Sequence, residues 1–318
     1  MLITSRPWTA DAVPAQHGRT AVVTGANTGL GFETARMLAE RGATVVLACR
    51  DAAKAAAAAQ RIRAVAPGGR VATLALDLAS QASVHRAADR LRAEHERIDL
   101  LVNNAGGMRP VLRVTEDGFE CTLATNHLGP FAFTGLVLDR LLAAPGSRVV
   151  TVSSIGHLAG RIRFGDPHFT SGYRRWPAYF QSKLANLMFT FELNRRLAAA
   201  GAPTVAPTVA LAAHPGNART EFGRDMNRLL RALLLGKRTR PVTSWFIQDP
   251  EIGALATVRA AADPAARGGD YYGPGGFGQF TGYPVRVRPG VRARDAAAGA
   301  RLWRESERLT GVRYPFGR

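Results

Sequence analysis

Short apolar runs alternate regularly with longer amphipathic stretches along most of the chain. The apolar runs are rich in β-branched residues and end at turn-forming residues, a pattern typical of strands that helices cover on both faces. Strands are predicted at residues 20–24, 44–49, 71–76, 100–102, 148–152 and 204–212. Between them apolar residues recur at helical spacing, and helices are predicted at residues 32–41, 52–65, 80–96, 118–142 and 179–200. This alternation predicts an α/β fold with a doubly wound parallel sheet, the Rossmann fold.

Two regions interrupt the alternation. Residues 156–176 read as a loop-like insert, and residues 217–249 form an amphipathic stretch rich in leucine and aromatic residues. Excursions beyond the carboxyl ends of parallel strands are where such folds build substrate pockets. We therefore expect a single domain over residues 1–318, with a substrate lid at about 217–249 and a C-terminal tail at about 284–318.

The chain is strongly basic, with a formal net charge of +18. Most of its arginines are scattered through the predicted helices and mixed with acids, as on a solvated face, although residues 219–240 and 286–294 are denser in positive charge. A basic surface attracts nucleic acid or anionic lipid, and this interpretation stays open as an alternative. No zinc spacing, aromatic ladder or helix-turn-helix accompanies the charge, so nucleic acid is not predicted as a partner.

The cysteines and the hydropathy pattern indicate in which cellular compartment the protein is expected. Only Cys49 and Cys121 occur, with no spacing that could clamp a metal, and no metal site is expected. No segment offers the roughly eighteen clean apolar residues of a membrane span, and the first residues lack a signal-peptide pattern. A soluble, cytoplasmic protein without an integral membrane segment is predicted.

A glycine-rich turn directly follows the first predicted strand and opens the first helix. Backbone N–H groups and the helix dipole can hold a pyrophosphate in this context. Gly25 permits a tight turn, while Gly29 and Gly31 allow close approach of a phosphate and of helix to strand. The predicted dinucleotide-binding residues of this turn are Gly25, Asn27, Thr28, Gly29, Leu30 and Gly31.

Residues after the next strands refine the choice of nucleotide. An acid at the end of the second strand would bind both ribose hydroxyls and select NAD, but this chain has Arg50, which could pair with a 2′-phosphate. NADP is therefore favoured. NAD stays possible, because Asp51 lies one position later and Thr28 supplies no second positive charge. Asp77 and Leu78 end the third strand, where a carboxylate can contact the adenine.

Tyr179 and Lys183 supply the candidate acid-base chemistry. Side chains four residues apart lie on one face of a helix, so the ammonium can lie beside the phenol and lower the cost of removing its proton. Such a pair can exchange a proton with a reacting oxygen. The spacing alone is frequent by chance, and its meaning depends on the rest of the chain.

Several motifs along the chain occur in the order of one family. They are Thr24-Gly25-x-x-x-Gly29-x-Gly31, Asp77, Asn103-Asn104-Ala105-Gly106, Asn126, Val152-Ser153-Ser154, Tyr179-x-x-x-Lys183 and His214-Pro215-Gly216. From about residue 18 to residue 282 the chain resembles the short-chain dehydrogenase/reductase family. The resemblance implies that Tyr179 is the general acid or base and that Lys183 binds the nicotinamide ribose.

The resemblance also implies further roles. Ser154 would polarise a substrate carbonyl, and Asn126 would anchor a proton-relay water. The cofactor would be contacted by Asn104, Ala105 and Gly106 after the fourth strand and by Pro215, Gly216 and Thr220 near the nicotinamide amide. His127 and His214, which adjoin these motifs, are interpreted as structural or cofactor-shell residues, because no second histidine or carboxylate completes a metal set.

Ser154 lies further before Tyr179 than the serine does in many family members, and this spacing looks like the retinol dehydrogenase-like branch. The segments 116–120, 126–129 and 182–186 are also similar to that branch. Two departures are the missing N-terminal membrane anchor of several vertebrate members and Pro130, where a histidine is common. The resemblance therefore supports the cofactor and hydride chemistry more than a retinoid substrate.

The resemblance implies an NADP-dependent oxidoreductase that transfers a hydride to or from a carbonyl or alcohol substrate. The leucine-rich lid favours an apolar aldehyde or ketone. Two alternatives are a light-dependent protochlorophyllide reductase-like enzyme, which shares the tyrosine and lysine, and a sensor or scaffold that binds NADP without turnover. A homo-oligomer is possible, since family members often pair through the helix that carries Tyr179, although the preceding insert could cap that surface.

Overall fold

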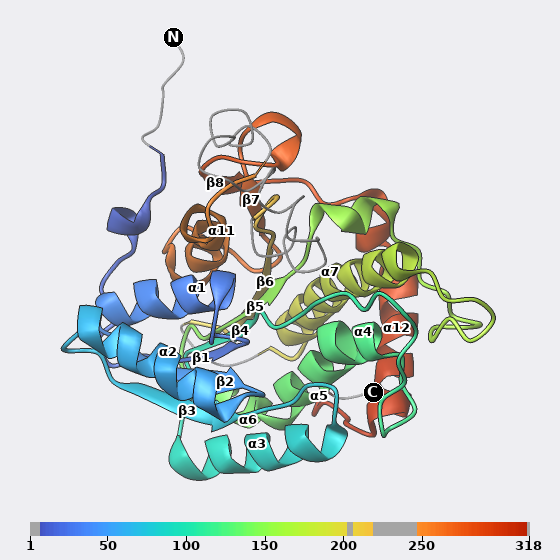
Figure 1. Ribbon diagram of the computed structural model, residues 1–318, viewed down its shortest axis with the longest axis horizontal. Coiled ribbons are helices and arrows are strands. Elements are labelled where there is room, and N and C mark those ends of the chain that lie inside the picture. The colour runs from blue at the N-terminus through green and yellow to red at the C-terminus, as the bar shows by residue number, and fades with distance from the viewer. Residues whose placement is uncertain (1–6, 202–205, 219–246, 317–318) are drawn as a thin grey trace.

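The computed structural model describes residues 7–201, 206–218 and 247–316. Its centre is an eight-stranded sheet with the order β3-β2-β1-β4-β5-β6-β7-β8 (Figure 1). The strands from β1 to β7 are parallel to their neighbours, and β8 pairs antiparallel with β7. They are β1 (Thr20–Thr24), β2 (Thr44–Cys49), β3 (Val71–Ala75), β4 (Leu100–Asn103), β5 (Arg148–Val152), β6 (Val209–Ala213), β7 (Tyr271–Pro274) and β8 (Pro284–Arg286). The predicted Rossmann fold is confirmed.

Helices cover both faces of this sheet (Figure 1). One layer consists of α1 (Gly29–Glu40), α2 (Ala52–Val65) and α11 (Pro250–Ala262), and the other of α3 (Gln81–Glu94), α5 (Gly129–Leu136), α7 (Arg175–Ala199) and α12 (Ala296–Thr310). Residues of the central strands are buried between these layers. Val22, for example, is buried and pairs with Val46 on one side and with Leu101 on the other. Burial on both faces explains why the strands read as continuous apolar runs.

The helix predicted at residues 118–142 is interrupted. It consists of α4 (Cys121–Leu123), a π-helical turn η2 (Ala124–Leu128), α5 and α6 (Leu138–Leu142). A π turn closes its hydrogen bonds one residue later than an α turn and is frequent at functional sites. Asn126 lies within this turn, so the irregularity is placed at a predicted site residue.

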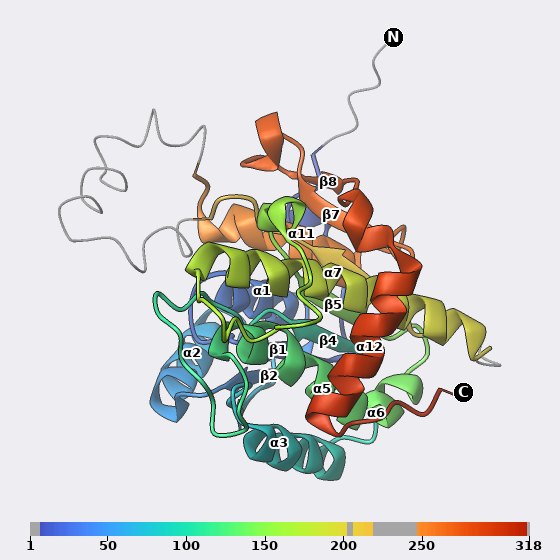
Figure 2. The same ribbon diagram turned by 90° about the vertical axis from the view of Figure 1, so that its right-hand side faces the viewer.

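The expected C-terminal tail contains ordered elements, namely β8, the short helix η5 (Val291–Arg294) and α12. Helix α12 packs along α7 and α5 (Figure 2). Its Trp303 is buried with ring centroids 5.1 Å from Phe131 and 5.9 Å from Phe189. The side chain of Asp295 accepts a hydrogen bond from the Ala298 N–H, and left-handed Gly311 ends the helix. This segment therefore completes the core.

The two regions predicted to interrupt the alternation, residues 156–176 and 217–249, are described to different extents. The insert at 156–176 is mostly irregular after a short helix, η3 (Ile155–Ala159), and it leads into α7 at Arg175. Most of the predicted lid, at residues 219–246, lies outside the described residues. The strand predicted at 204–212 begins only at Val209, and residues 204–205 also lie outside the described part.

Candidate active site

Two turns meet where the strand order reverses, because β2 and β3 follow on one side of β1 and β4 lies on the other. The Thr24 Oγ1 atom accepts hydrogen bonds from the N–H groups of Asn104 at 3.0 Å and Ala105 at 2.9 Å. The Asn104 Nδ2 atom donates to the Thr24 carbonyl oxygen at 2.8 Å. The turns after β1 and β4 thus form one unit at the position where doubly wound folds bind nucleotides.

The glycines of the first turn permit this contact. A Cβ atom on Gly25, whose φ is +66°, would lie 2.9 Å from the Ala105 Cα. One on Gly31 would lie 2.4 Å from Asn104 Nδ2 and 2.5 Å from the Gly25 carbonyl oxygen. Helix α1 begins at Gly29, and the N–H groups of a first helical turn lack intrahelical acceptors. The turn therefore presents backbone donors in a compact cradle, which fits a dinucleotide pyrophosphate.

Arg50 and Asp51, the two charged residues that follow β2, have different surroundings. Asp51 caps α2, because its Oδ1 accepts from the Lys54 N–H at 3.0 Å and its Oδ2 pairs with Lys54 Nζ at 2.8 Å. Arg50 is exposed and forms no ion pair with any described residue. The Asp51 carboxylate is thus engaged by Lys54, whereas the Arg50 guanidinium is available to bind an anion.

The residues predicted around the adenine shape the turn after β3. The Asp77 Oδ1 atom accepts from the Ala79 N–H at 3.0 Å. Leu78 is buried, and its carbonyl oxygen lies so close to Gly129 that a Cβ there would be 2.2 Å away. Leu78 therefore packs against the start of α5, while Asp77 organises the turn beside the strand end.

Tyr179 and Lys183 lie in the buried part of α7, with 7% and 2% of their surfaces exposed. The Lys183 Nζ atom donates to the Val152 carbonyl oxygen at 3.2 Å and lies 5.6 Å from the centroid of the Tyr179 ring. A Cβ on Gly106 would be 3.3 Å from the same Nζ. The lysine thus reaches past the end of β5 to the turn after β4, with the phenol on the same helix.

Asn126 joins that turn to α7. Its Nδ2 atom donates to the Gly107 carbonyl oxygen and to Ser182 Oγ, both at 2.9 Å, and its Oδ1 accepts from the Gly107 N–H at 2.8 Å. Ser182 Oγ in turn donates to the Tyr179 carbonyl oxygen at 2.7 Å. Both amide N–H groups of Asn126 are therefore used to hold the turn after β4 against the turn of helix that carries the tyrosine.

The two serines after β5 have different surroundings. Ser153 is fully buried, and its hydroxyl donates to the Lys183 carbonyl oxygen at 2.7 Å. The Ser154 Oγ accepts a hydrogen bond from the Gly156 N–H at 3.2 Å. A hydroxyl has one proton to donate. The hydroxyl proton of Ser153 is donated to the backbone of α7. Among the residues that the structure describes, Ser154 only accepts a hydrogen bond, so its hydroxyl proton is available for a ligand.

His157 belongs to the site, although sequence reasoning did not select it. Its Nε2 accepts from the Gly290 N–H at 3.0 Å, so in the neutral ring Nδ1 carries the proton and donates to the Ser154 carbonyl oxygen at 2.7 Å. Burial lowers the pKa of His157, which favours this neutral form. Its position three residues after Ser154 was the signal that could have identified it.

The two histidines that the sequence did single out lie in packed positions. The His127 Nε2 atom lies 2.9 Å from Ser306 Oγ of α12, and the His214 Nε2 atom lies 2.9 Å from Gln279 Oε1. Burial lowers the pKa of each to about 4. Both side chains are therefore neutral hydrogen-bonding groups that join distant segments of the chain.

The segment after β6 contacts the loop that follows β7. Gly216 has a φ of +63°, and a Cβ there would be 2.3 Å from the Phe280 carbonyl oxygen. The Pro215 carbonyl oxygen accepts from Gln248 Nε2. This contact fixes the path of the chain from the carboxyl end of β6. Thr220, predicted to contact the cofactor, lies outside the described residues.

An aromatic side chain flanks Tyr179. Trp176 lies one turn earlier on α7, is 47% exposed and stacks on Phe180 with centroids 5.7 Å apart. Its ring meets the Tyr179 ring edge to face at 6.5 Å. Trp176 lies at the end of the insert predicted at residues 156–176 and offers an exposed apolar face beside the phenol.

The described residues contain neither a candidate metal centre nor a candidate membrane span. Within residues 7–201, 206–218 and 247–316, no three histidine, cysteine or acidic side chains gather as metal ligands would. None of the helices in the same ranges has the length and apolar character needed to span a bilayer.

The chain matches the family model of short chain dehydrogenases over residues 19–228. It is 41% identical to human retinol dehydrogenase 13 over 300 residues, which cover 94% of this chain and 86% of that protein. Its fold is similar to the crystal structure of an uncharacterized protein from Mycobacterium paratuberculosis, with a TM-score of 0.78, 42% identity and coverage of 97% and 99% of the two chains. It is also similar to a Pseudomonas aeruginosa RhlG/NADP active-site complex, with a TM-score of 0.62, 25% identity and coverage of 84% and 96%.

Proposed function

Because the chain belongs to the short-chain dehydrogenase family, in its retinol dehydrogenase-like branch, we propose that it interconverts apolar aldehydes or ketones with their alcohols and uses NADP. Membership itself makes the protein an NAD(P)-dependent oxidoreductase acting on CH–OH or C=O groups. The choice of NADP, the apolar substrate and the roles of individual residues are the proposed parts. The convergence of Lys183 Nζ and Asn126 beside Gly106, with Lys183 one helical turn after Tyr179, is the observation that supports the residue roles.

The glycine-rich turn and the turn after β4 would hold the nucleotide, which when bound supplies or accepts the hydride. Arg50 favours NADP, since its exposed guanidinium lies at the end of β2 and can pair with a 2′-phosphate. Asp51 does not oppose this pairing, because it caps α2 and is paired with Lys54.

The proton steps fall to side chains of α7 and of the turn after β5. In reduction, the Tyr179 phenol gives its proton to the oxygen that becomes the alcohol, while the available Ser154 hydroxyl donates a hydrogen bond to the same oxygen. That bond strengthens as negative charge develops, which lowers the barrier. Lys183 adds a fixed positive charge nearby. Each such group is typically worth ~10²-fold or more in rate.

Two observations favour an apolar substrate. Trp176 leaves 47% of its surface exposed beside Tyr179, and a partly exposed indole gains from burial against an apolar ligand. The similar human protein is named a retinol dehydrogenase, and retinol is largely apolar. A small hydroxy acid has little apolar surface to bury against this indole.

The test is oxidation of NADPH and of NADH in darkness, followed by the absorbance of the reduced cofactor, with matched apolar and polar aldehydes and ketones. We expect turnover that prefers NADPH and apolar carbonyls. Tyr179→Phe should abolish it while NADPH binding, followed by cofactor fluorescence, persists. Cofactor binding without turnover of any carbonyl would favour a sensor, and turnover that requires light would favour a protochlorophyllide reductase-like enzyme. Either result would overturn the proposal.

A further inference from the structure

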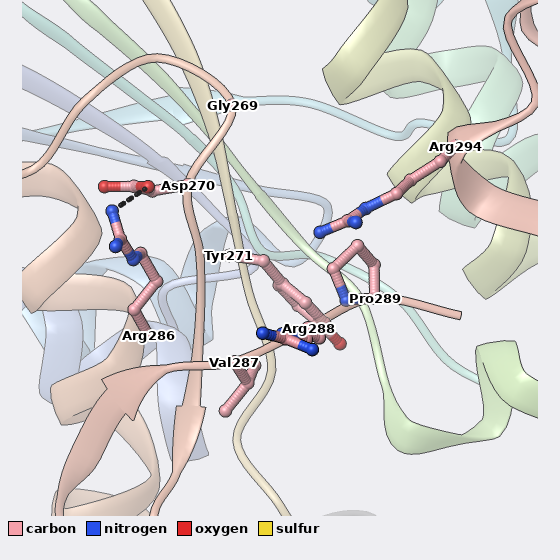
Figure 3. Close-up of a pocket in the computed structure, with 8 residues that line it drawn as sticks. All are labelled: Gly269, Asp270, Tyr271, Arg286, Val287, Arg288, Pro289 and Arg294. Atoms are coloured by element: carbon pink, nitrogen blue, oxygen red, sulfur yellow. Dashed lines mark hydrogen bonds and ion pairs between the residues drawn. The ribbon is translucent and has the colours of Figure 1, made fainter. Parts of the chain in front are cut away.

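A hollow lies at the outer edge of the sheet, beside β7 and β8 (Figure 3). Its volume is about 410 Å³, and its lining includes Asp270, Tyr271, Arg286, Arg288, Pro289 and Arg294. Strands β4, β5 and β6 separate β7 from β1 and its glycine-rich turn. The hollow is therefore separate from the cofactor turns, and its size is that of small-molecule sites.

The lining carries three arginines and one carboxylate. Asp270 is already engaged, since its Oδ1 pairs with Arg286 Nη1 at 3.3 Å. Its Oδ2 accepts from the Arg267 N–H at 2.9 Å and from the Tyr272 hydroxyl at 3.2 Å. Figure 3 shows Arg286 turned toward this carboxylate. Asp270 therefore balances Arg286, and the charges of Arg288 and Arg294 remain.

Arg288 and Arg294 are exposed and border the hollow from two different segments (Figure 3). Neither forms an ion pair within the ranges that the structure describes. Their backbones are held, because the Val287 N–H donates to the Tyr271 carbonyl oxygen at 2.8 Å and Ala293 is buried. Two like charges thus extend from anchored backbone positions beside one cavity, and an anion between them would reduce their mutual repulsion.

We propose that this hollow binds the phosphate group of an anionic ligand between Arg288 and Arg294. The planar guanidinium presents paired N–H donors that match phosphate oxygens, and two such groups from different segments can hold one phosphate from two sides. The group could belong to a soluble phosphorylated compound or to a phospholipid headgroup.

Neighbouring side chains allow these sources to be distinguished. Leu158 and Val291 are 54% and 87% exposed. Gly290, which precedes Val291, lies against Leu158, since a Cβ on it would be 3.1 Å from Leu158 Cδ2. Exposed apolar side chains beside arginines gain energy at a lipid interface but not from a small soluble anion.

The first experiment titrates inorganic pyrophosphate into the protein by calorimetry at low ionic strength, with NADP⁺ saturating the cofactor turns. We expect binding that weakens at least tenfold in Arg288→Ala/Arg294→Ala, because each charge-assisted hydrogen bond is worth ~1.5–3 kcal/mol. Arg86→Ala, an exposed arginine on α3, is the matched control and should bind as the unchanged protein does. Thermal melting of both variants checks that they fold.

The second experiment sediments the protein with phosphatidylglycerol or phosphatidylcholine vesicles. Binding to the anionic vesicles that falls in Arg288→Ala/Arg294→Ala and also in Leu158→Asp/Val291→Asp would assign the phosphate to lipid. Pyrophosphate binding that depends only on the arginines would assign it to a soluble ligand. The proposal is overturned if neither probe binds, or if binding is the same in Arg288→Ala/Arg294→Ala and Arg86→Ala. These readouts do not depend on turnover.

Discussion

The glycine-rich turn after β1 is shaped by close approaches that only glycine permits, whereas the region around Tyr179 is shaped by buried polar side chains. In the first region, Gly31 approaches the Gly25 carbonyl oxygen so closely that a methyl group would not fit. In the second, Asn126, Ser153 and His157 each form a buried hydrogen bond that fixes a segment of the candidate active site.

This difference predicts different sensitivities. A backbone contact fails when volume is added, while a hydrogen-bonded network fails when a group changes its charge. The buried histidines, which are His127, His157 and His214, all lie in segments after β4. Acid should therefore weaken the region around Tyr179, and added methyl groups should weaken the nucleotide turn.

The largest effect is expected from acid. Burial lowers the pKa of His127 and His214 to about 4, below the unfolded value of about 6.5. The unfolded chain then binds more protons as pH falls, so this stability is complete above about pH 6.5 and is lost on the way down to about pH 4. When the pH is lowered from 8 to 5, the low pKa of each histidine should reduce the free energy of unfolding by about 2 kcal/mol, measured by urea denaturation.

His127→Gln tests that assignment, because glutamine can still hydrogen-bond but does not titrate in this range. Its loss of stability between pH 8 and 5 should be about 2 kcal/mol smaller than that of the unchanged protein. His85→Gln, at an exposed position on α3, should leave the loss unchanged. An equal acid loss in all three proteins would contradict the role of His127.

The next effect should come from Gly31→Ala. The new methyl group would lie 2.4 Å from Asn104 Nδ2 and 2.5 Å from a carbonyl oxygen, so the turns after β1 and β4 must separate. We expect a loss of ~1–3 kcal/mol in unfolding free energy and weaker NADPH binding. Gly68→Ala is the matched control, since a Cβ there meets no described atom within 4 Å. Unchanged cofactor affinity in Gly31→Ala would show that the contact does not shape the cradle.

A smaller and more selective effect is expected from Arg50→Ala. The guanidinium is exposed, so stability should hold, but the ratio of kcat/KM for NADPH over NADH should fall by about tenfold or more as a charge-assisted contact is lost. Arg86→Ala should keep the ratio. A ratio unchanged in Arg50→Ala would remove the argument for NADP at the end of β2.

The smallest effect should come from Trp176→Ala. Losing the exposed indole face should lower kcat/KM a few-fold for long apolar carbonyls and leave short ones unaffected, because a chain must extend from the Tyr179 hydroxyl to the neighbouring indole to be buried against it. Trp176→Phe should restore most of the loss, since it keeps an aromatic face. An equal loss for short and long substrates would indicate that Trp176 instead supports the tyrosine.

Glycine turns and buried strands could be predicted from the sequence, whereas irregular turns held by side chains could not. Turns that need glycine, such as the one at Gly25, leave a distinctive residue type, and buried strands leave apolar runs whose bounds were predicted within a few residues for most strands. The π turn around Asn126 leaves no such trace, because one extra residue in a turn barely alters the apolar spacing.

Helix α12 was missed for a different reason. Its buried residues Gly299, Leu302, Trp303, Ser306 and Thr310 do recur at helical spacing, but residues 284–318 follow the last family motif and were interpreted as a tail. Its signals were the cap at Asp295 and the terminating Gly311. His157 was overlooked because its only sequence signal is its position three residues after Ser154, and its contact is with the backbone carbonyl of that residue. The roles assigned to Tyr179 and Ser154 stay predictions.

Strand β8 has a consequence for how copies of this chain meet. As the last strand of the sheet it is only Pro284–Arg286, and it carries a proline, which has no N–H, and an arginine whose side chain is 68% exposed. Long flat edge strands invite pairing with another chain, and shortness, proline and charge each oppose it. The β8 edge therefore guards against aggregation by strand addition, and two copies of this chain are not expected to join through it.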